Sequence, residues 1–137
     1  MTGLVLSGAD CRRLLAGRCV GRVVHTEQAL PTVTPVPYAV DDDGVVFRAE
    51  AGGALARTAA TGSVLAFHVD SVDLQGGWSV LVVGLARQLT SVRGKGAAAS
   101  LGAADDREEE AAVYVRVPFS RVSGCTVPPV PGGTTEP

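Results

Sequence analysis

The most apolar run of the chain is Trp78-Ser-Val-Leu-Val-Val-Gly-Leu-Ala86, which is rich in β-branched valine and carries no charged residue. It is too short to cross a membrane and is typical of a strand inside a sheet. We therefore expect a strand over residues 78–90 that is buried on both faces. A strand of this kind needs hydrogen-bonding neighbours on both sides, so the rest of the 137 residues must supply them.

Strand-like composition recurs before and after this run. The further predicted strands are residues 19–26, 32–40, 45–50, 63–70 and 112–122. A hairpin is expected at Asp41-Asp-Asp-Gly44, where Asp-Gly can take the positive φ of a tight turn. Pro31, Pro35 and Pro37 exclude a central, fully paired strand over 32–40, because proline has no N–H for the ladder. An edge, a bulge or a kinked strand is expected there.

Helical signals are few. Ser7-Gly-Ala-Asp10 has the composition of an N-cap and predicts a helix of about three turns that ends near Gly17. Residues 52–60 predict a short helix. Residues 71–77 are expected to form a polar loop, and residues 91–110 a loop with a weak helix. We expect one domain over residues 1–126, followed by a disordered Pro/Gly-rich tail over residues 127–137.

These elements predict a mainly β protein of the α+β class with six antiparallel strands, one N-terminal helix and one short helix. Six strands with two apolar faces must curl into a small closed or split barrel, or find a partner. Because one small barrel cannot bury so much apolar strand surface alone, we expect a homodimer.

Composition excludes several functions. The net charge is −2 and no basic run is present, which argues against a nucleic-acid partner. No apolar stretch reaches 18 residues and no signal peptide is recognisable, so we expect a cytoplasmic protein without a membrane partner. Of the 12 basic residues 11 are arginine, which indicates the codon bias of a GC-rich genome rather than an arginine-rich binding surface.

The chain shows no constellation of catalytic or metal-binding residues. His25 and His68 lie far apart in the sequence, and no Cys-x-x-Cys or His-x-x-x-His pattern exists, so we expect no metal and interpret both histidines as hydrogen-bonded structural residues. No Gly-x-Ser-x-Gly motif is present either. Catalytic residues are therefore not identifiable, and any chemistry would come from a bound cofactor.

An ordered set of segments over residues 4–126 carries a family resemblance. The segments are Asp10-Cys-Arg-Arg-Leu-Leu15, Val20-Gly-Arg-Val-Val24, Leu30-Pro31, Thr34-Pro-Val36, Val45-Val-Phe-Arg48, Gly52, Leu55, Val64-Leu-Ala-Phe67, Val69-Asp70, Gly77-Trp-Ser-Val80, Gly84, Ala86 and Arg121-Val-Ser-Gly124. In this order they resemble the flavin-binding split-barrel family of the pyridoxamine 5′-phosphate oxidase type, particularly its small actinobacterial members. The piece around Trp78 is the most specific.

The resemblance implies a six-stranded split-barrel homodimer with flavin mononucleotide (FMN) at the subunit interface. Relatives hold the phosphate with Arg-Thr-x-x-Gly-Ser-Lys-Leu, where this chain has Arg48-Ala-Glu-Ala-Gly-Gly-Ala-Leu55. Arg48 and Gly52 match that pattern, whereas Ala49, Gly53 and Ala54 replace the Thr, Ser and Lys. The usual Asn after Pro-Val is Pro37.

Three further residues complete the candidate cofactor site. We hypothesise that Arg57, on the predicted short helix, supplies the positive charge of the missing lysine. In relatives the stretch around Trp78 and Ser79 lies beside the flavin, so these two residues are candidates to contact the ring. The alternatives are a solvent-exposed Arg57 and a Trp78 that only fills the interface core.

The resemblance implies an FMN-dependent oxidoreductase that acts on a small organic substrate of unknown identity. The replacements in the phosphate segment leave a second hypothesis open, a non-catalytic or degenerate split-barrel dimer with weak or no flavin binding. A third is a reductase that uses the deazaflavin cofactor F420, because its family shares this barrel.

Overall fold

The structure of the chain, a computed structural model, describes residues 3–89, 96–101 and 112–132. Its elements are α1 (Gly8–Ala16), β1 (Val20–Glu27), β2 (Leu30–Val40), β3 (Gly44–Glu50), α2 (Ala54–Ala60), β4 (Val64–Asp73), β5 (Gly76–Leu85), β6 (Arg87–Gln88), α3 (Gly96–Ala99), β7 (Ala112–Pro118) and β8 (Arg121–Val127). All strand pairs are antiparallel, in the order β6-β7-β3-β2-β1-β4-β5-β8. The prediction of a mainly β protein with an N-terminal helix and a short second helix is confirmed.

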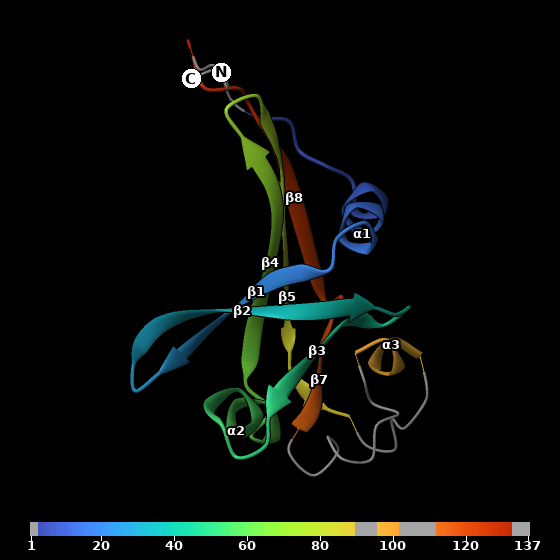
Figure 1. Cartoon of the computed structure of the whole chain (residues 1–137), viewed down its shortest axis with the longest axis vertical. Coiled ribbons are helices and arrows are strands. Elements are labelled where there is room, and N and C mark those ends of the chain that lie inside the picture. Colours follow the sequence, from blue (N-terminus) through green and yellow to red (C-terminus); the bar gives the residue numbers. More distant parts are fainter. Residues whose placement is uncertain (1–2, 90–95, 102–111, 133–137) are drawn as a thin grey trace.

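The sheet curls into a split barrel (Figure 1). β7 and β8 lie toward opposite ends of the strand order, yet only Phe119 and Ser120 separate them in the chain. We call the strands β2-β1-β4-β5-β8 sheet A and the strands β2-β3-β7-β6 sheet B. The inward faces of both sheets form the main core, whose largest fully buried side chains include Leu15, Val23, Val45, Phe47, Leu65, Phe67, Val69, Val80, Val82, Val115 and Val117.

The predicted strand count of six was too low, because two predicted strands are each divided. Within the described part of residues 78–90, β5 ends at Leu85 and β6 begins at Arg87, since the N–H of Ala86 leaves the ladder and donates to Ser63 O at 3.0 Å. The predicted strand 112–122 reverses at Phe119, where Pro118 cannot donate to a ladder. Thr90 lies outside the described residues.

Two expectations about the β4–β5 region were wrong. The predicted loop 71–77 is mostly strand, because β4 runs to Asp73 and β5 starts at Gly76, with Asp73 Oδ1 accepting the N–H of Gln75 at 2.7 Å in the turn. The run after Trp78 is not buried on both faces of the single chain. Val80 and Val82 are fully buried, but the outward side chains of Ser79, Leu81 and Val83 are half-buried.

The hairpin predicted at residues 41–44 is confirmed, but its turn chemistry differs. Neither Asp43 nor Gly44 has a positive φ. Instead, Asp41 Oδ1 accepts the N–H groups of Asp43 and Gly44, both at 2.9 Å, and the N–H of Asp41 donates to Gly44 O at 3.0 Å. The first aspartate of the run closes this turn through its side chain.

The three prolines of β2 all lie on one side of its backbone. β2 pairs with β1 from Leu30 to Pro37, but it pairs with β3 only over residues 38–40. The N–H of Tyr38 donates to Cys19 O on the β1 side, so the odd-numbered positions 31, 35 and 37 turn their missing N–H away from β1. β2 is therefore an interior strand whose proline-rich half is paired on one side only, as the prolines predicted.

Helix α1 packs on the outer strands of sheet A. Ser7 caps it by accepting the N–H of Asp10 at 3.1 Å, which confirms the predicted N-cap. Cys11 and Leu15 are fully buried, and Tyr38 donates its hydroxyl to Leu15 O. Burial raises the pKa of Tyr38 to about 12. Gly124 on β8 allows this packing, because a Cβ there would lie 2.8 Å from Cys11 Sγ.

The β1–β2 turn stores backbone strain. Gln28 and Ala29 have φ of 51° and 65°, the left-handed region that a two-residue hairpin turn requires and that costs a non-glycine residue about 1–2 kcal/mol. Ala29→Gly should raise the free energy of unfolding by about 0.5–1 kcal/mol after the greater flexibility of glycine in the unfolded chain is subtracted. Denaturant unfolding checks this, with Ala51→Gly, at an exposed turn residue without a positive φ, as the control that should not stabilise.

The first and last described segments lie side by side, at the tip of β4 and β5 (Figure 1), where the N–H of Thr126 donates to Leu4 O at 2.8 Å. Val127 is still part of β8, and the N–H of Val130 donates to Leu74 O at 2.9 Å. The domain boundary at residue 126 stays a prediction, and residues 133–137 lie outside the described residues. Within the described part of the chain, none of the helices has the length and apolar character needed to span a bilayer.

Candidate functional site

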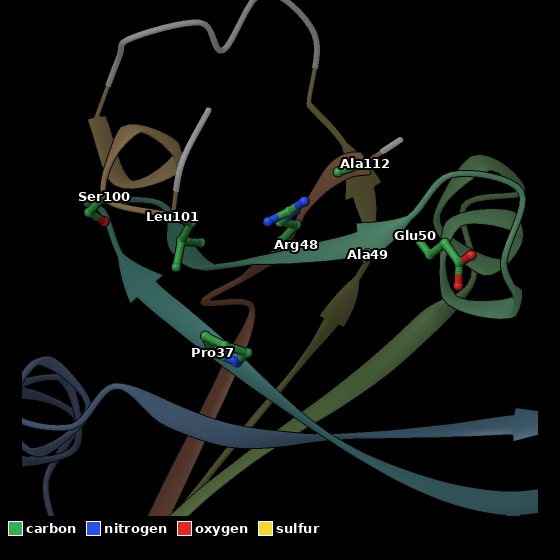
Figure 2. Close-up of a pocket in the computed structure, with 7 residues that line it drawn as sticks. All are labelled: Pro37, Arg48, Ala49, Glu50, Ser100, Leu101 and Ala112. Atoms are coloured by element: carbon green, nitrogen blue, oxygen red, sulfur yellow. The ribbon is translucent and has the colours of Figure 1, made fainter. Parts of the chain in front are cut away.

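A pocket opens where β2 parts from β3. It has a volume of about 540 Å³ and is lined by Pro37, Arg48, Ala49, Glu50, Ser100, Leu101 and Ala112. Figure 2 shows Pro37 on one diverging strand and Arg48 above the other, between Leu101 and Ala112. We call this the Arg48 pocket. Its size is in the range of small-molecule sites, which are mostly apolar with a few placed polar groups.

The segment around α3 supplies one wall of the Arg48 pocket. Val46, Tyr114 and Ala98 form a second, small core on the outward face of sheet B, with Leu101 packed against it. The hydroxyl of Tyr114 donates to Leu101 O at 3.4 Å. The helix that the sequence only weakly predicted is therefore what places Ser100 and Leu101 at the pocket.

Arg48 and Glu50 set the charge of the Arg48 pocket. Both have even positions on β3, so they lie on the same face, and their cross-strand partners on β7 are Tyr114 and Ala112. Arg48 is half-buried and Glu50 is exposed. In Figure 2 the carboxylate of Glu50 points away from Arg48, whose guanidinium is the cationic group among the described lining residues and has the chemistry to donate to an anionic ligand.

A smaller polar pocket lies beside α2. Its volume is about 280 Å³, and its lining is Thr26, Glu27, Gln28, Ala54, Arg57, Thr58 and Thr61. Arg57 Nη1 donates to Gly52 O at 2.6 Å, so the guanidinium is fixed on the loop that leads from β3 into α2. In that loop Gly52 has a φ of +78°, and the N–H of Gly53 donates to Glu50 O at 3.0 Å.

The structure divides the eight predicted cofactor residues among four places. Arg48 and Ala49 line the Arg48 pocket, Ala54 and Arg57 line the polar pocket, and Gly52 and Gly53 lie in the loop between them. Trp78 and Ser79 lie on β5 and line neither pocket. Their assignment to the flavin stays a prediction.

The side chains of Trp78 and Ser79 have structural partners. Trp78 is half-buried and packs against the main core. Ser79 Oγ lies 2.8 Å from His68 Nε2, and His25 Nε2 lies 3.0 Å from Thr34 Oγ1, which confirms that both histidines are hydrogen-bonded. Within residues 3–89, 96–101 and 112–132, no three His, Cys, Asp or Glu side chains gather as a metal site would require.

The sequence does not identify four of the seven lining residues of the Arg48 pocket. Glu50 stands at a variable position of the phosphate segment, and the sequence predicts no binding role for Ser100, Leu101 or Ala112. No local signal marks those three residues, because they reach the pocket only through the packing of α3 and β7. The sequence does offer one signal for this pocket, because Pro37 stands where the family resemblance implies an asparagine.

The chain is similar to known proteins in both sequence and fold. Residues 7–126 match the family described as pyridoxamine 5′-phosphate oxidase. An FAD-binding protein from Mycobacterium smegmatis is 26% identical, with 91% of this chain and 98% of that chain covered and a TM-score of 0.69. An FAD-binding protein from Mesorhizobium loti is 26% identical, with 93% and 98% covered and a TM-score of 0.74.

A curated relative is closer in sequence over a shorter span. An uncharacterized protein of Mycobacterium tuberculosis is 39% identical over 87 residues, which are 59% of this chain and 57% of the relative, so the match spans little more than half of that protein's length. The fold is thus a split barrel, and the solved structures similar to it include FAD-binding proteins. The chain belongs to the pyridoxamine 5′-phosphate oxidase family.

Proposed function

We propose that this protein is a flavin-dependent oxidoreductase acting on a small organic substrate, and that Arg48 binds the phosphate of the flavin. The observation that carries the proposal is the Arg48 pocket, a cavity of about 540 Å³ with one guanidinium in its lining. A bound flavin supplies transfer of a hydride or of single electrons. The family relationship and the FAD-binding proteins at 26% identity support this choice.

The lining residues suit a flavin nucleotide. Pro37, Leu101 and Ala112 offer apolar surface for a ring, and Ser100, whose hydroxyl donates to Ala97 O at 2.7 Å, offers a hydroxyl oxygen that can accept a hydrogen bond. Arg48 can donate two hydrogen bonds to a phosphate in one plane. The chain's own contribution is to bind and orient the cofactor and to exclude water from it.

FMN and FAD share the flavin ring, the ribityl chain and the first phosphate, so the Arg48 pocket serves either. FMN is the cofactor that the family resemblance implies, whereas the names of the two relatives specify FAD. The two cofactors differ in the adenosine monophosphate part, for which the sequence predicted no site. Titration with each cofactor distinguishes them.

A second candidate function is a split-barrel protein with weak or no flavin binding. The observation that favours it is the phosphate segment itself, because Ala49, Gly53 and Ala54 provide no hydroxyl or amine. In addition, Arg57 Nη1 is already occupied by Gly52 O, and Ala54 lies in the polar pocket instead of the Arg48 pocket. Arg48 is then the one cation among the described residues that line the Arg48 pocket.

The experiment is a titration of the purified protein with FMN, FAD, riboflavin and F420, followed by fluorescence quenching and by the mass of any cofactor released on denaturation. Micromolar or tighter binding of FMN or FAD, with riboflavin weaker, supports the first proposal. A colourless protein that takes up none of the four supports the second candidate. Preference for F420 would contradict both and would indicate a deazaflavin reductase.

We further propose that the protein is a homodimer through the outward face of sheet A. The cross-strand pairing places these apolar side chains on it: Val20, Val24, Val33, Val64, Ala66, Val83 and Leu85. Val33 is 57% and Val64 is 63% exposed, which is typical of an interaction surface. Arg22 and Asp70 form an ion pair of 3.4 Å on the same face, and such a pair is self-complementary across a two-fold axis.

Val33→Thr tests the interface without disturbing the strand. It keeps the branched shape and the β-propensity but puts a hydroxyl on the apolar face, at a cost of about 1 kcal/mol per protomer. The dimer dissociation constant should rise about tenfold or more, measured by sedimentation. Val130→Thr changes a valine of comparable exposure, 48%, on the C-terminal segment and should leave the constant unchanged. A wild-type chain that sediments as a monomer contradicts the proposal.

A further inference from the structure

β3 is paired very differently on its two sides. Toward β7 every residue from Gly44 to Glu50 has a cross-strand partner. Toward β2 it forms only three pairs, which begin at the hairpin and end with Tyr38 opposite Phe47. Both strands continue beyond this point, β2 for eight more residues and β3 for three. The Arg48 pocket begins where the pairing stops, since its lining includes Pro37 on one strand and Arg48, Ala49 and Glu50 on the other.

The β2–β3 ladder stops where it meets proline. Tyr38 directs its N–H to Cys19 O on β1, so the residues on either side of it turn their backbone nitrogens toward β3. At the same register, the next two positions of β2 that face β3 would be opposite Arg48 and Glu50. Those positions are Pro37 and Pro35, neither of which can donate.

We propose that Pro37, supported by Pro35, holds the Arg48 pocket open by preventing β2 and β3 from closing into a continuous ladder. This deepens the proposed function and rests on it for the identity of the ligand. Pro37 and Pro35 are positioning residues, because they act through the separation of the two strands. Pro31 has the same parity but no such role, since the same register would place it opposite Ala54, which is already in α2.

The test is Pro37→Val, and the double variant Pro35→Val with Pro37→Val. Valine has high β-propensity and restores the N–H, so we expect the ladder to extend by one or two pairs. In the flavin-free variant the new amide at position 37 should be protected from hydrogen exchange at least tenfold over an exposed amide. Affinity for the preferred flavin should fall about tenfold in the single variant and further in the double variant.

Pro31→Val is the matched control, with the same chemical change in the same strand. It should leave flavin affinity unchanged, and its new amide should exchange freely. A freely exchanging amide at position 37 would overturn the inference, and so would a protected amide combined with unchanged flavin affinity. If the wild-type chain binds no flavin, the proposed function fails, while the exchange measurement still decides whether the prolines stop the ladder.

Discussion

Arg48→Ala should weaken the binding of FMN or FAD by about ten- to a hundredfold. A hydrogen bond to a charged group contributes roughly 1.5–3 kcal/mol, and each 1.4 kcal/mol is about tenfold in affinity. In the structure Arg48 is the guanidinium in the lining of the 540 Å³ pocket, and Arg57 is already fixed on Gly52 O in the neighbouring pocket. Among the described residues of that lining, no second cation compensates for the loss. Fluorescence titration of the wild type and the variant measures it.

Two controls show whether the loss of affinity is specific to Arg48 and to the phosphate. Riboflavin has no phosphate, so its affinity should be nearly the same in the wild type and in Arg48→Ala. Arg87→Ala removes an exposed arginine from β6, outside the Arg48 pocket, and should leave FMN binding unchanged. Equal weakening of riboflavin and FMN would show that Arg48 supports the ring or the fold, and unchanged FMN binding would refute the assignment of the phosphate to Arg48.

The fold could be predicted largely from local patterns. Valine-rich alternation, the Ser7 cap and the aspartate-rich hairpin are each determined within a few residues, and all three recur in the structure. The errors came where tertiary contacts decide. The strand breaks at Ala86 and Phe119 follow from hydrogen bonds to Ser63 and Asp43, which lie more than twenty residues earlier in the chain.

The candidate site was less predictable, because it is assembled from three separate segments. Arg48 is predicted from its place in the phosphate segment, and Pro37 departs from the asparagine that the family resemblance implies after Pro-Val. Ser100 and Leu101 depend on how α3 packs on Val46 and Tyr114, which no local pattern encodes. The family motif also suggested that Ala54 and Arg48 share one pocket, whereas the structure places them in two.

Asp41→Ala should lower the free energy of unfolding by about 2–4 kcal/mol and the melting temperature by about 10 °C. The carboxylate closes the β2–β3 turn through two backbone N–H groups, and its other oxygen accepts two hydrogen bonds from Arg116 on β7. The two side chains are only 23% and 27% exposed, so the variant leaves the guanidinium without its partner in a poorly hydrated place. Asp42→Ala, at the exposed neighbour, should change little.

The same residue predicts an acid-dependent loss of stability. Burial alone raises the pKa of Asp41, but the hydrogen bonds from Arg116 and from the N–H groups of Asp43 and Gly44 outweigh it and lower the pKa below its ordinary value of 3.8. A pKa that is lower in the folded state means that the stabilisation is fully present above the unfolded pKa and is lost as the pH falls through the folded one. The free-energy difference between the wild type and Asp41→Ala should therefore be constant from neutral pH down to about pH 5 and should shrink below about pH 4. Denaturant unfolding of both proteins over this range measures it, and a difference that does not change with pH would mean that the ionised carboxylate contributes nothing beyond its packing.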